Sequence, residues 1–390
     1  STLSNLTHFQ LVRQDLPATT SRLYFNAGTF GPLPTCAMTA MQERLQDEWQ
    51  QGRLGAAAFE SISTLYTSAR GGAARLLHAQ DGEIALTDNT GEGLNIISYG
   101  LNWREGDEVI TTNHEHISLL APLYQLRDRY GIVIRVADIG EQGDRPVLKQ
   151  IADLVTPRTR LISISHVSWM TGAVLNIHEV GYMGREWGIP VLIDGAQSAG
   201  AIPLDLHALD VDFYATPMQK WLCGPDGTGA LYVRQDSLSY VQPTYVGYWS
   251  SKHEADHRWE LMETAQRFEL GGRQTAAIAG QAAVFHWLEH TVGHAWMFER
   301  IATLSAYAYH ALRDLPGVQM LTPRPGESGL VAFRLEDKDD TEIVTTLREK
   351  HNIFIRNIPE THALRVSTGF YNSEEEVDTL VKALHEIARS

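Results

Sequence analysis

Seven short runs rich in β-branched and aromatic residues recur between residues 81 and 233, and helical patterns separate most of them. They are EIALT (83–87), EVITT (108–112), IVIRVADI (132–139), LISISHVS (161–168), PVLIDG (190–195), DFYAT (212–216) and GALYV (229–233). Strands that alternate with helical segments of roughly 10–15 residues predict parallel crossover units. We therefore expect an α/β fold whose mostly parallel, seven-stranded sheet is covered by helices on both faces.

The character of the chain changes after about residue 271. Alanine-rich helical sequence leads to a strand, a helix, a second strand and a last helix: GLVAFRL, DTEIVTTLREKH, IFIRNI and EEEVDTLVKALHEIA. That order predicts a small α+β domain. We expect an N-terminal arm (residues 1–20) that packs with the small domain, a large cofactor-binding domain (21–270), and linking helices followed by the small domain (271–390).

Composition excludes several classes of function. The 390-residue chain carries a formal net charge of −15, which disfavours nucleic acids and anionic membranes as partners. Its two cysteines, Cys36 and Cys223, give no disulfide framework and no metal-ligand spacing, and they fit a reducing compartment. The N-terminal segment lacks an apolar signal core, and no apolar run reaches membrane-spanning length. These features predict a cytoplasmic enzyme without a bound metal.

A carboxylate and a lysine mark the chemistry. Asp194 ends the predicted strand VLID, and about 26 residues later Lys220 follows another strand and precedes the turn-rich sequence WLCGPDGTG. Most lysines are solvated, and an aspartate after a strand often caps a helix. However, a lysine at a tight, buried loop has a lowered pKa, which favours imine formation. A lysine that forms an imine and an acid that holds a pyridinium nitrogen are what pyridoxal phosphate (PLP) chemistry requires.

Other residues could complete such a site. The sequence TDNTGEGLN (87–95) places Gly91 and Glu92 between a strand and a helix, where backbone amides favour a phosphate, and Gln219 beside the lysine could donate a further hydrogen bond. His116 follows a strand and could stack on a cofactor ring, although a structural histidine fits the same pattern. Arg356 and Arg365 could hold a carboxylate, although either alone could equally be a surface residue.

At these residues the chain resembles the class V aminotransferase family of fold-type I PLP enzymes. The resemblance begins at about residue 22 and rests on an ordered set of motifs: TDNTGEGLN, NHEHIS, SHVSWMTGAVLNI, IDGAQSAG, DFYATPMQKWLCGPDGTGALYV, RFELGG and RVSTGFYNSEEE. It implies a role for each matching residue. These are Schiff-base formation (Lys220), the ring nitrogen (Asp194), the phenolic oxygen (Gln197), ring stacking (His116), phosphate binding (amides of Gly91 and Glu92) and the substrate carboxylate (Arg365, with Arg356, Trp169 and Asn26 nearby).

Departures from the family pattern bear on the reaction. Cysteine desulfurases carry a persulfide-accepting cysteine in the small domain, where this chain has none. The usual Ser-x-His before the lysine reads Pro217-Met218-Gln219, which leaves Gln219, with Thr216 as a substitute, to hold the phosphate. Trp169 replaces a usual asparagine, and Gly271-Gly272 replaces the Gly-Thr that a neighbouring subunit supplies.

Without that cysteine, sulfur transfer to the protein lacks its nucleophile. The resemblance therefore favours the C–S lyase branch, in which L-cystine or cysteine is cleaved to pyruvate, ammonia and a persulfide or sulfide product. It also implies a homodimer, a sulfur amino acid as substrate, and an acceptor for the persulfide. The alternatives are an aminotransferase or epimerase of the same family, a desulfurase lacking the usual cysteine, and a non-catalytic protein of the same fold.

Overall fold

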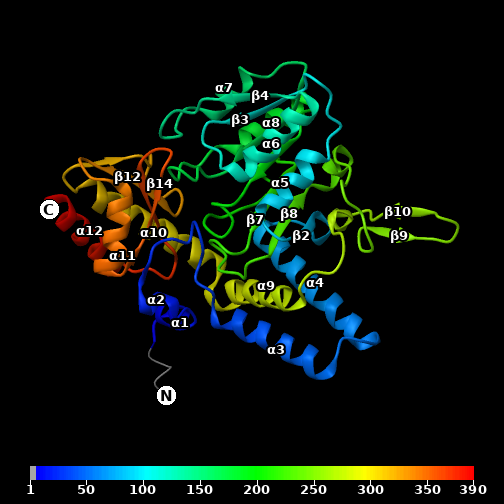
Figure 1. Cartoon of the computed structure of the whole chain (residues 1–390), viewed down its shortest axis with the longest axis horizontal. Helices are drawn as coiled ribbons and strands as arrows, with labels where there is room; N and C mark the ends of the chain where they lie inside the picture. Colours follow the sequence, from blue (N-terminus) through cyan, green and yellow to red (C-terminus); the bar gives the residue numbers. More distant parts are fainter. Residues whose placement is uncertain (1–5) are drawn as a thin grey trace.

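The computed structural model describes residues 6–390 and is built around one large sheet (Figure 1). Its seven strands lie in the order β2-β8-β7-β6-β5-β3-β4. In that order they are β2 (Ile84–Thr87), β8 (Gly229–Val233), β7 (Phe213–Pro217), β6 (Val191–Asp194), β5 (Thr159–Ser165), β3 (Glu108–Thr112) and β4 (Val133–Ala137). Each lies within or overlaps one of the seven predicted runs, so the predicted seven-stranded α/β sheet is confirmed.

One strand departs from the parallel pattern. β8 runs antiparallel to both β7 and β2, whereas the pairs from β7 through to β4 are parallel. The residues between β7 and β8 form turns rather than a crossover helix, so the chain reverses direction there. Lys220 lies in this reversal.

Helices cover both faces of the sheet. Neighbouring residues of β6 show this, because Leu192 and Ile193 point into different apolar clusters. Residues of α5 (Thr90–Tyr99) and α6 (Ile117–Tyr130) complete the cluster of Leu192, and residues of α4 (Ala56–Leu77) and α8 (Ile177–Trp187) complete that of Ile193. Residues of α3 (Thr35–Gln51), α7 (Val147–Ala152) and α9 (Thr275–Trp287) also belong to the cluster of Ile193.

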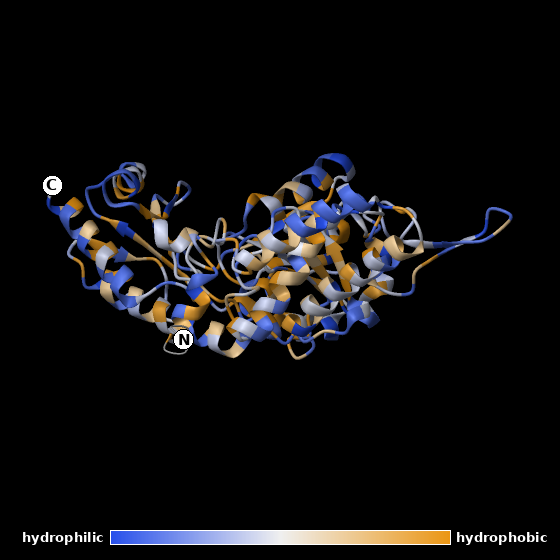
Figure 2. Cartoon of the chain, turned by 90° about the horizontal axis from the view of Figure 1, so that it is seen from below, coloured by the Kyte–Doolittle hydropathy of each residue, from blue (hydrophilic) through white to orange (hydrophobic). Residues whose placement is uncertain are grey.

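A two-stranded hairpin projects from the large domain (Figures 1 and 2). It consists of β9 (Ser251–His253) and β10 (Trp259–Leu261), which pair antiparallel. Figure 2 shows hydrophobic residues concentrated on the central strands and hydrophilic ones on the outer helices. No helix in residues 6–390 is long and apolar enough to cross a membrane.

The small domain is a four-stranded antiparallel sheet backed by helices, which agrees with the predicted α+β class, although only two of the four strands were predicted. Its strand order is β11-β12-β15-β14. The strands are β11 (Val318–Met320), β12 (Leu330–Leu335), β14 (Arg356–Ile358) and β15 (Ala363–Ser367), and the helices are α10 (His294–Arg313), α11 (Asp340–His351) and α12 (Glu374–Arg389). A separate apolar cluster, which includes Phe333, Leu347 and Leu380, forms its core.

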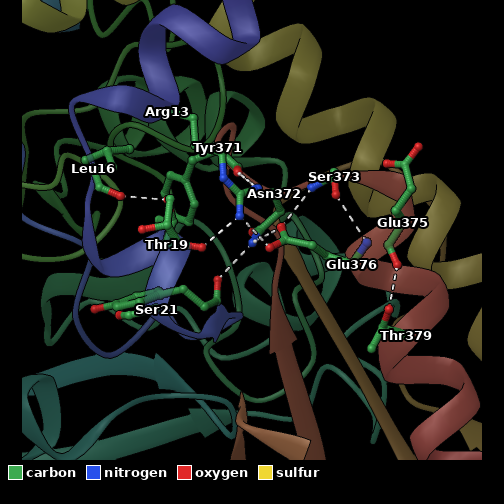
Figure 3. Close-up of polar contacts among 12 residues, drawn as sticks. Arg13, Leu16, Thr19, Ser21, Tyr371, Asn372, Ser373, Glu375, Glu376 and Thr379 are labelled. Atoms are coloured by element: carbon green, nitrogen blue, oxygen red, sulfur yellow. Dashed lines mark hydrogen bonds and ion pairs between the residues drawn. The ribbon is translucent and has the colours of Figure 1, made fainter.

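The N-terminal part of the chain lies against the small domain. After α1 (His8–Gln14) and α2 (Ala18–Ser21), strand β1 (Leu23–Tyr24) pairs with β13 (Ile353–Phe354), the first half of the run IFIRNI. Arg13 donates hydrogen bonds to Glu376 at 2.8 Å and to the carbonyl of Tyr371 at 3.1 Å (Figure 3). The expected arm began at residue 1, and its first five residues lie outside the described part.

Candidate active site

A cavity of about 270 Å³ opens where the parallel strands end. Ligands bind at the carboxyl ends of strands in sheets of this kind. Seven of the residues singled out from the sequence line it: Gly91, His116, Trp169, Asp194, Gln197, Gln219 and Lys220. Five others do not line it: Asn26, Glu92, Thr216, Arg356 and Arg365.

Lys220 lies on the wall of the cavity with no ion-pair partner in residues 6–390. The pKa of its ammonium group is lowered to about 8, chiefly by burial; Asp194 opposes this shift, and the charges of Arg365 and Arg356 add to it. The loop is packed closely, because Gly31 donates its amide to the carbonyl of Gln219 at 2.7 Å. A Cβ at Gly31 would lie 2.1 Å from the carbonyl oxygen of Lys220, so only glycine fits there.

Asp194 is the last residue of β6 and is almost completely buried. Its Oδ1 accepts the amide N–H of Ala196 at 3.0 Å. Burial raises the pKa of the carboxyl, while this hydrogen bond and the charge of Lys220 oppose the rise. The carboxylate therefore lacks a direct cationic partner and would be stabilised by a protonated ring nitrogen.

His116 begins α6 as its N-cap. Its Nδ1 accepts the amide N–H of Ser118 at 3.1 Å, so the proton of the neutral ring lies on Nε2. Burial, followed by the nearby charge of Lys220, lowers the pKa of the imidazole to about 4. The ring meets Trp169 edge to face at 5.0 Å between centroids. A neutral, oriented imidazole at the wall of the cavity suits stacking on an aromatic ring.

The amino end of α5 forms another part of the wall. Thr90 Oγ1 and Gln219 Oε1 are buried and have no hydrogen-bond partner within the described chain. The Thr90 hydroxyl at the amino terminus of the helix can donate to a phosphate, whereas Gln219 would donate through its amide nitrogen, because its Oε1 only accepts. Glu92 differs from expectation, because its amide already donates to Asn89 Oδ1 at 2.8 Å and its carboxylate pairs with Arg273.

Gln197 is held at both ends of its amide. Its Nε2 donates to the carbonyl of Gly28 at 2.9 Å, and its Oε1 accepts the indole N–H of Trp221 at 2.9 Å. Thr216, by contrast, donates its hydroxyl to the carbonyl of Ala230 at 3.2 Å on the neighbouring strand. The structure therefore places Gln197 at the cavity and turns the hydroxyl of Thr216 away from it.

Arg356 and Arg365 are direct neighbours across β14 and β15. Arg365 is 1% exposed and donates from Nη1 to the carbonyl of Trp169 at 2.9 Å. Burial, and then the charge of Arg356, lower the pKa of Arg365 to about 9. The Arg356 guanidinium lies 5.7 Å from the Trp169 ring centroid. Both arginines therefore contact Trp169, which lines the cavity, and do not line the cavity themselves.

Asn26 belongs to a segment that contacts both Arg365 and Gln197. Its Oδ1 accepts the hydroxyl of Thr29 at 2.9 Å, and Thr29 contacts Nη2 of Arg365 at 3.5 Å. Two residues further along from Asn26, the carbonyl of Gly28 holds Gln197. The segment thus lies between the arginines and the cavity.

Neither cysteine lies at the cavity. Burial raises the pKa of Cys36 to about 11 and raises that of the fully buried Cys223 further. A thiol with a raised pKa is a poor nucleophile because little thiolate is present. No cluster of potential metal ligands occurs among residues 6–390.

Sequence reasoning missed two residues at this site, Glu115 and Ser165. Ser165 is the last residue of β5 and lines the cavity beside Asp194. Its position at a strand end next to the strand of Asp194 could have identified it. Glu115 lies beneath the cavity, and nothing in its sequence context distinguishes it from an exposed acid.

Comparisons with known proteins identify the family of this chain. The Aminotransferase class-V family model matches residues 22–380. The cystine C–S lyase C-DES, in complex with cysteine persulfide, is 31% identical with a TM-score of 0.90, covering 95% of this chain and 99% of that one. A C-DES variant with glycine covalently linked to its PLP cofactor is 31% identical with a TM-score of 0.91, covering 96% and 99%. A probable cysteine desulfurase of Methanothermobacter thermautotrophicus is 28% identical, covering 97% of each chain.

The family match and the structural neighbours identify a PLP-dependent enzyme of fold type I. The chain belongs to the class V aminotransferase family, in the group of cysteine desulfurases and C–S lyases.

Proposed function

We propose that the enzyme is a C–S lyase that cleaves L-cystine by β-elimination to pyruvate, ammonia and cysteine persulfide. One observation carries the choice of reaction. The chain has only two cysteines, and both lie away from the cavity with raised thiol pKa values. A desulfurase transfers sulfur to a cysteine thiolate of its own, and no thiolate is available here. The similarity to C-DES supports the same choice.

The residues at the cavity fit PLP. Lys220 would bind its aldehyde carbon, Asp194 its ring nitrogen, Gln197 its phenolic oxygen and His116 a ring face. Gly91 and Gln219 would hold the phosphate, with Thr90 supplying its unpaired hydroxyl. When bound, PLP accepts the electron pair released at the substrate Cα.

Lys220 is the proposed base. With a pKa lowered to about 8, roughly a tenth of its amine is neutral at pH 7, and this neutral form can remove the proton from the substrate Cα. Asp194 stays ionised while it holds a proton on the ring nitrogen. The neutral His116 keeps the ring in place without adding a positive charge of its own.

Arg365 is the proposed partner of the substrate carboxylate, with Arg356 beside it. A buried guanidinium without a carboxylate partner gains most when a substrate supplies one. The carbonyl of Trp169 fixes Nη1 of Arg365, and Nε of Arg365 has no partner in the described chain. Trp169 and Asn26 would shape the space between substrate and arginines.

The leaving group favours a disulfide substrate. Breaking the Cβ–S bond of cystine releases cysteine persulfide, a better leaving group than a plain thiolate because its conjugate acid is stronger. One water is consumed when the remaining three-carbon fragment becomes pyruvate and ammonia, so cystine plus water balances the three products. The released persulfide then requires an acceptor, which we propose to be a small thiol or another protein.

The experiment is incubation of the purified enzyme with L-cystine and no added keto acid, followed by detection of pyruvate. An aminotransferase would form no pyruvate until a keto acid is added, and an epimerase would form D-configured product only.

We also propose that the enzyme is a homodimer and that its domain boundaries lie at residues 20 and 270. Sedimentation and limited proteolysis test these two points separately from the reaction.

A further inference from the structure

A buried glutamate lies beneath the cavity next to two of its key residues. Glu115 directly precedes His116 and is 6% exposed. Two other buried glutamates contact basic side chains: Glu269 pairs with Arg70, and Glu83 contacts His207 at 2.6 Å. Glu115 forms no ion pair with any residue of the described chain. A buried carboxyl without a cation is costly unless hydrogen bonds hold it.

Three donors hold this carboxyl. Thr112 Oγ1 donates to Oε2 at 2.8 Å, the amide of Ser165 donates to Oε1 at 3.0 Å, and the hydroxyl of Ser165 also donates to Oε1. Thr112 ends β3 and Ser165 ends β5. The register pairs between β3 and β5 end at Ile110 and Ile162. The carboxyl of Glu115 therefore connects the ends of the two strands, where they no longer pair with each other.

The same serine connects Glu115 to Asp194. On its other side Ser165 is the register partner of Asp194 across β5 and β6. The negative charge of Asp194 acts directly on Glu115, which places the two carboxyls in one electrostatic neighbourhood. Lys220 acts on Asp194 from the β7–β8 connection, and neutral His116 adjoins Glu115 on its own segment.

We propose that Glu115 is a positioning residue, whose carboxylate ties the ends of β3 and β5 together and adds a second negative charge behind Asp194. This rests on the proposed function only in assigning Asp194 to the cofactor ring. The added charge stabilises the proton on that ring nitrogen and on the Lys220 linkage, while the bonds to Ser165 fix the strand end beside Asp194. These positive charges in turn favour the ionised carboxylate in the holoenzyme, whereas burial raises the pKa of Glu115 in the cofactor-free protein. Glu115 does this from below the cavity and does not line it.

The test uses the holoenzyme and the pH titration of its visible cofactor absorbance. Glu115→Gln keeps the shape of the side chain but removes the charge. We expect the midpoint of the titration to fall by about one pH unit, a tenfold loss of proton affinity. An unchanged midpoint in a folded, cofactor-loaded Glu115→Gln enzyme would overturn the proposal.

Two further variants keep the result interpretable. Glu83→Gln removes another buried carboxylate away from the cavity and should leave the midpoint unchanged; an equal shift would show a non-specific effect and overturn the proposal. Thr112→Val removes one donor from the carboxyl of Glu115 and should lower the midpoint by a smaller amount. If Glu115→Gln does not fold, Thr112→Val serves as the test in its place. An unchanged titration midpoint in Thr112→Val would then contradict the proposal. Since absorbance is read without turnover, failure of cystine cleavage leaves this test intact.

Discussion

Arg356 and Arg365 face each other across β14 and β15, and neither forms an ion pair with any residue from 6 to 390. Two neighbouring guanidinium groups repel each other, and burial of one raises the cost. Such an arrangement is stabilised when an anion binds between or beside them. Together with Lys220, they make the environment of Trp169 strongly positive, which suits a substrate that carries carboxylates.

Arg365→Lys should weaken catalysis more than it weakens the fold. Lysine keeps the charge but loses the planar fork that donates to Trp169 and to a carboxylate. We expect kcat/KM for cystine to fall by roughly 30- to 150-fold, which corresponds to about 2–3 kcal/mol. Steady-state kinetics measure this, and Arg313→Lys on the surface of α10 serves as the control. An unchanged kcat/KM would remove Arg365 from the substrate site.

Lys220→Ala should abolish turnover and the visible absorbance of the lysine-bound cofactor. The substitution removes both the attachment point and the proposed base at the cavity wall. Absorption spectra and pyruvate formation measure the two losses. Lys149→Ala, which alters an exposed lysine paired with Asp153, should change neither. Normal turnover by Lys220→Ala would show that another residue is the base.

The double variant Cys36→Ala/Cys223→Ala should remain active. Neither thiol reaches the cavity, and burial keeps both protonated. We expect kcat/KM within about twofold of the parent, with stability lowered by roughly 1–2 kcal/mol because Cys223 is fully buried. Kinetics and thermal unfolding separate these effects. Loss of turnover in a folded double variant would revive the desulfurase alternative.

The stability of the cofactor-free protein should depend on pH through Glu115. Burial raises the pKa of its carboxyl from 4.5 to about 7, so between these values the folded state holds a proton that the unfolded state has lost. Its contribution is complete below pH 4.5 and is lost as the pH rises through 7. We therefore expect Glu115→Gln to gain roughly 2–3 kcal/mol relative to the parent between pH 4.5 and pH 8, measured by urea unfolding. No relative change with pH would show that Glu115 titrates normally.

Strands and strand-end residues were the most predictable features, because both follow from local patterns. β6 and Asp194 were read directly from an apolar run ending in an acid. The run IFIRNI was predicted as one strand, but it divides into β13 and β14 because its first half pairs with β1, more than 300 residues earlier. Such long-range pairing leaves no local signal.

Individual hydrogen bonds at the site were harder to predict. The amide of Glu92 belongs to the phosphate motif, yet the N-cap Asn89 occupies it. Thr216 precedes the lysine closely, yet its position in β7 turns its hydroxyl toward β8. Both outcomes depend on side-chain direction, which spacing in the sequence does not determine.

The most direct test of the central claim is the ratio of pyruvate to alanine formed from L-cystine as the sole substrate. Elimination yields one pyruvate and one persulfide for each cystine cleaved, with no alanine. In a parallel reaction with L-cysteine as the sole substrate, sulfur transfer to the protein would instead yield alanine. We predict pyruvate without alanine, both for the parent enzyme and for Cys36→Ala/Cys223→Ala. Alanine as the main product would contradict the account.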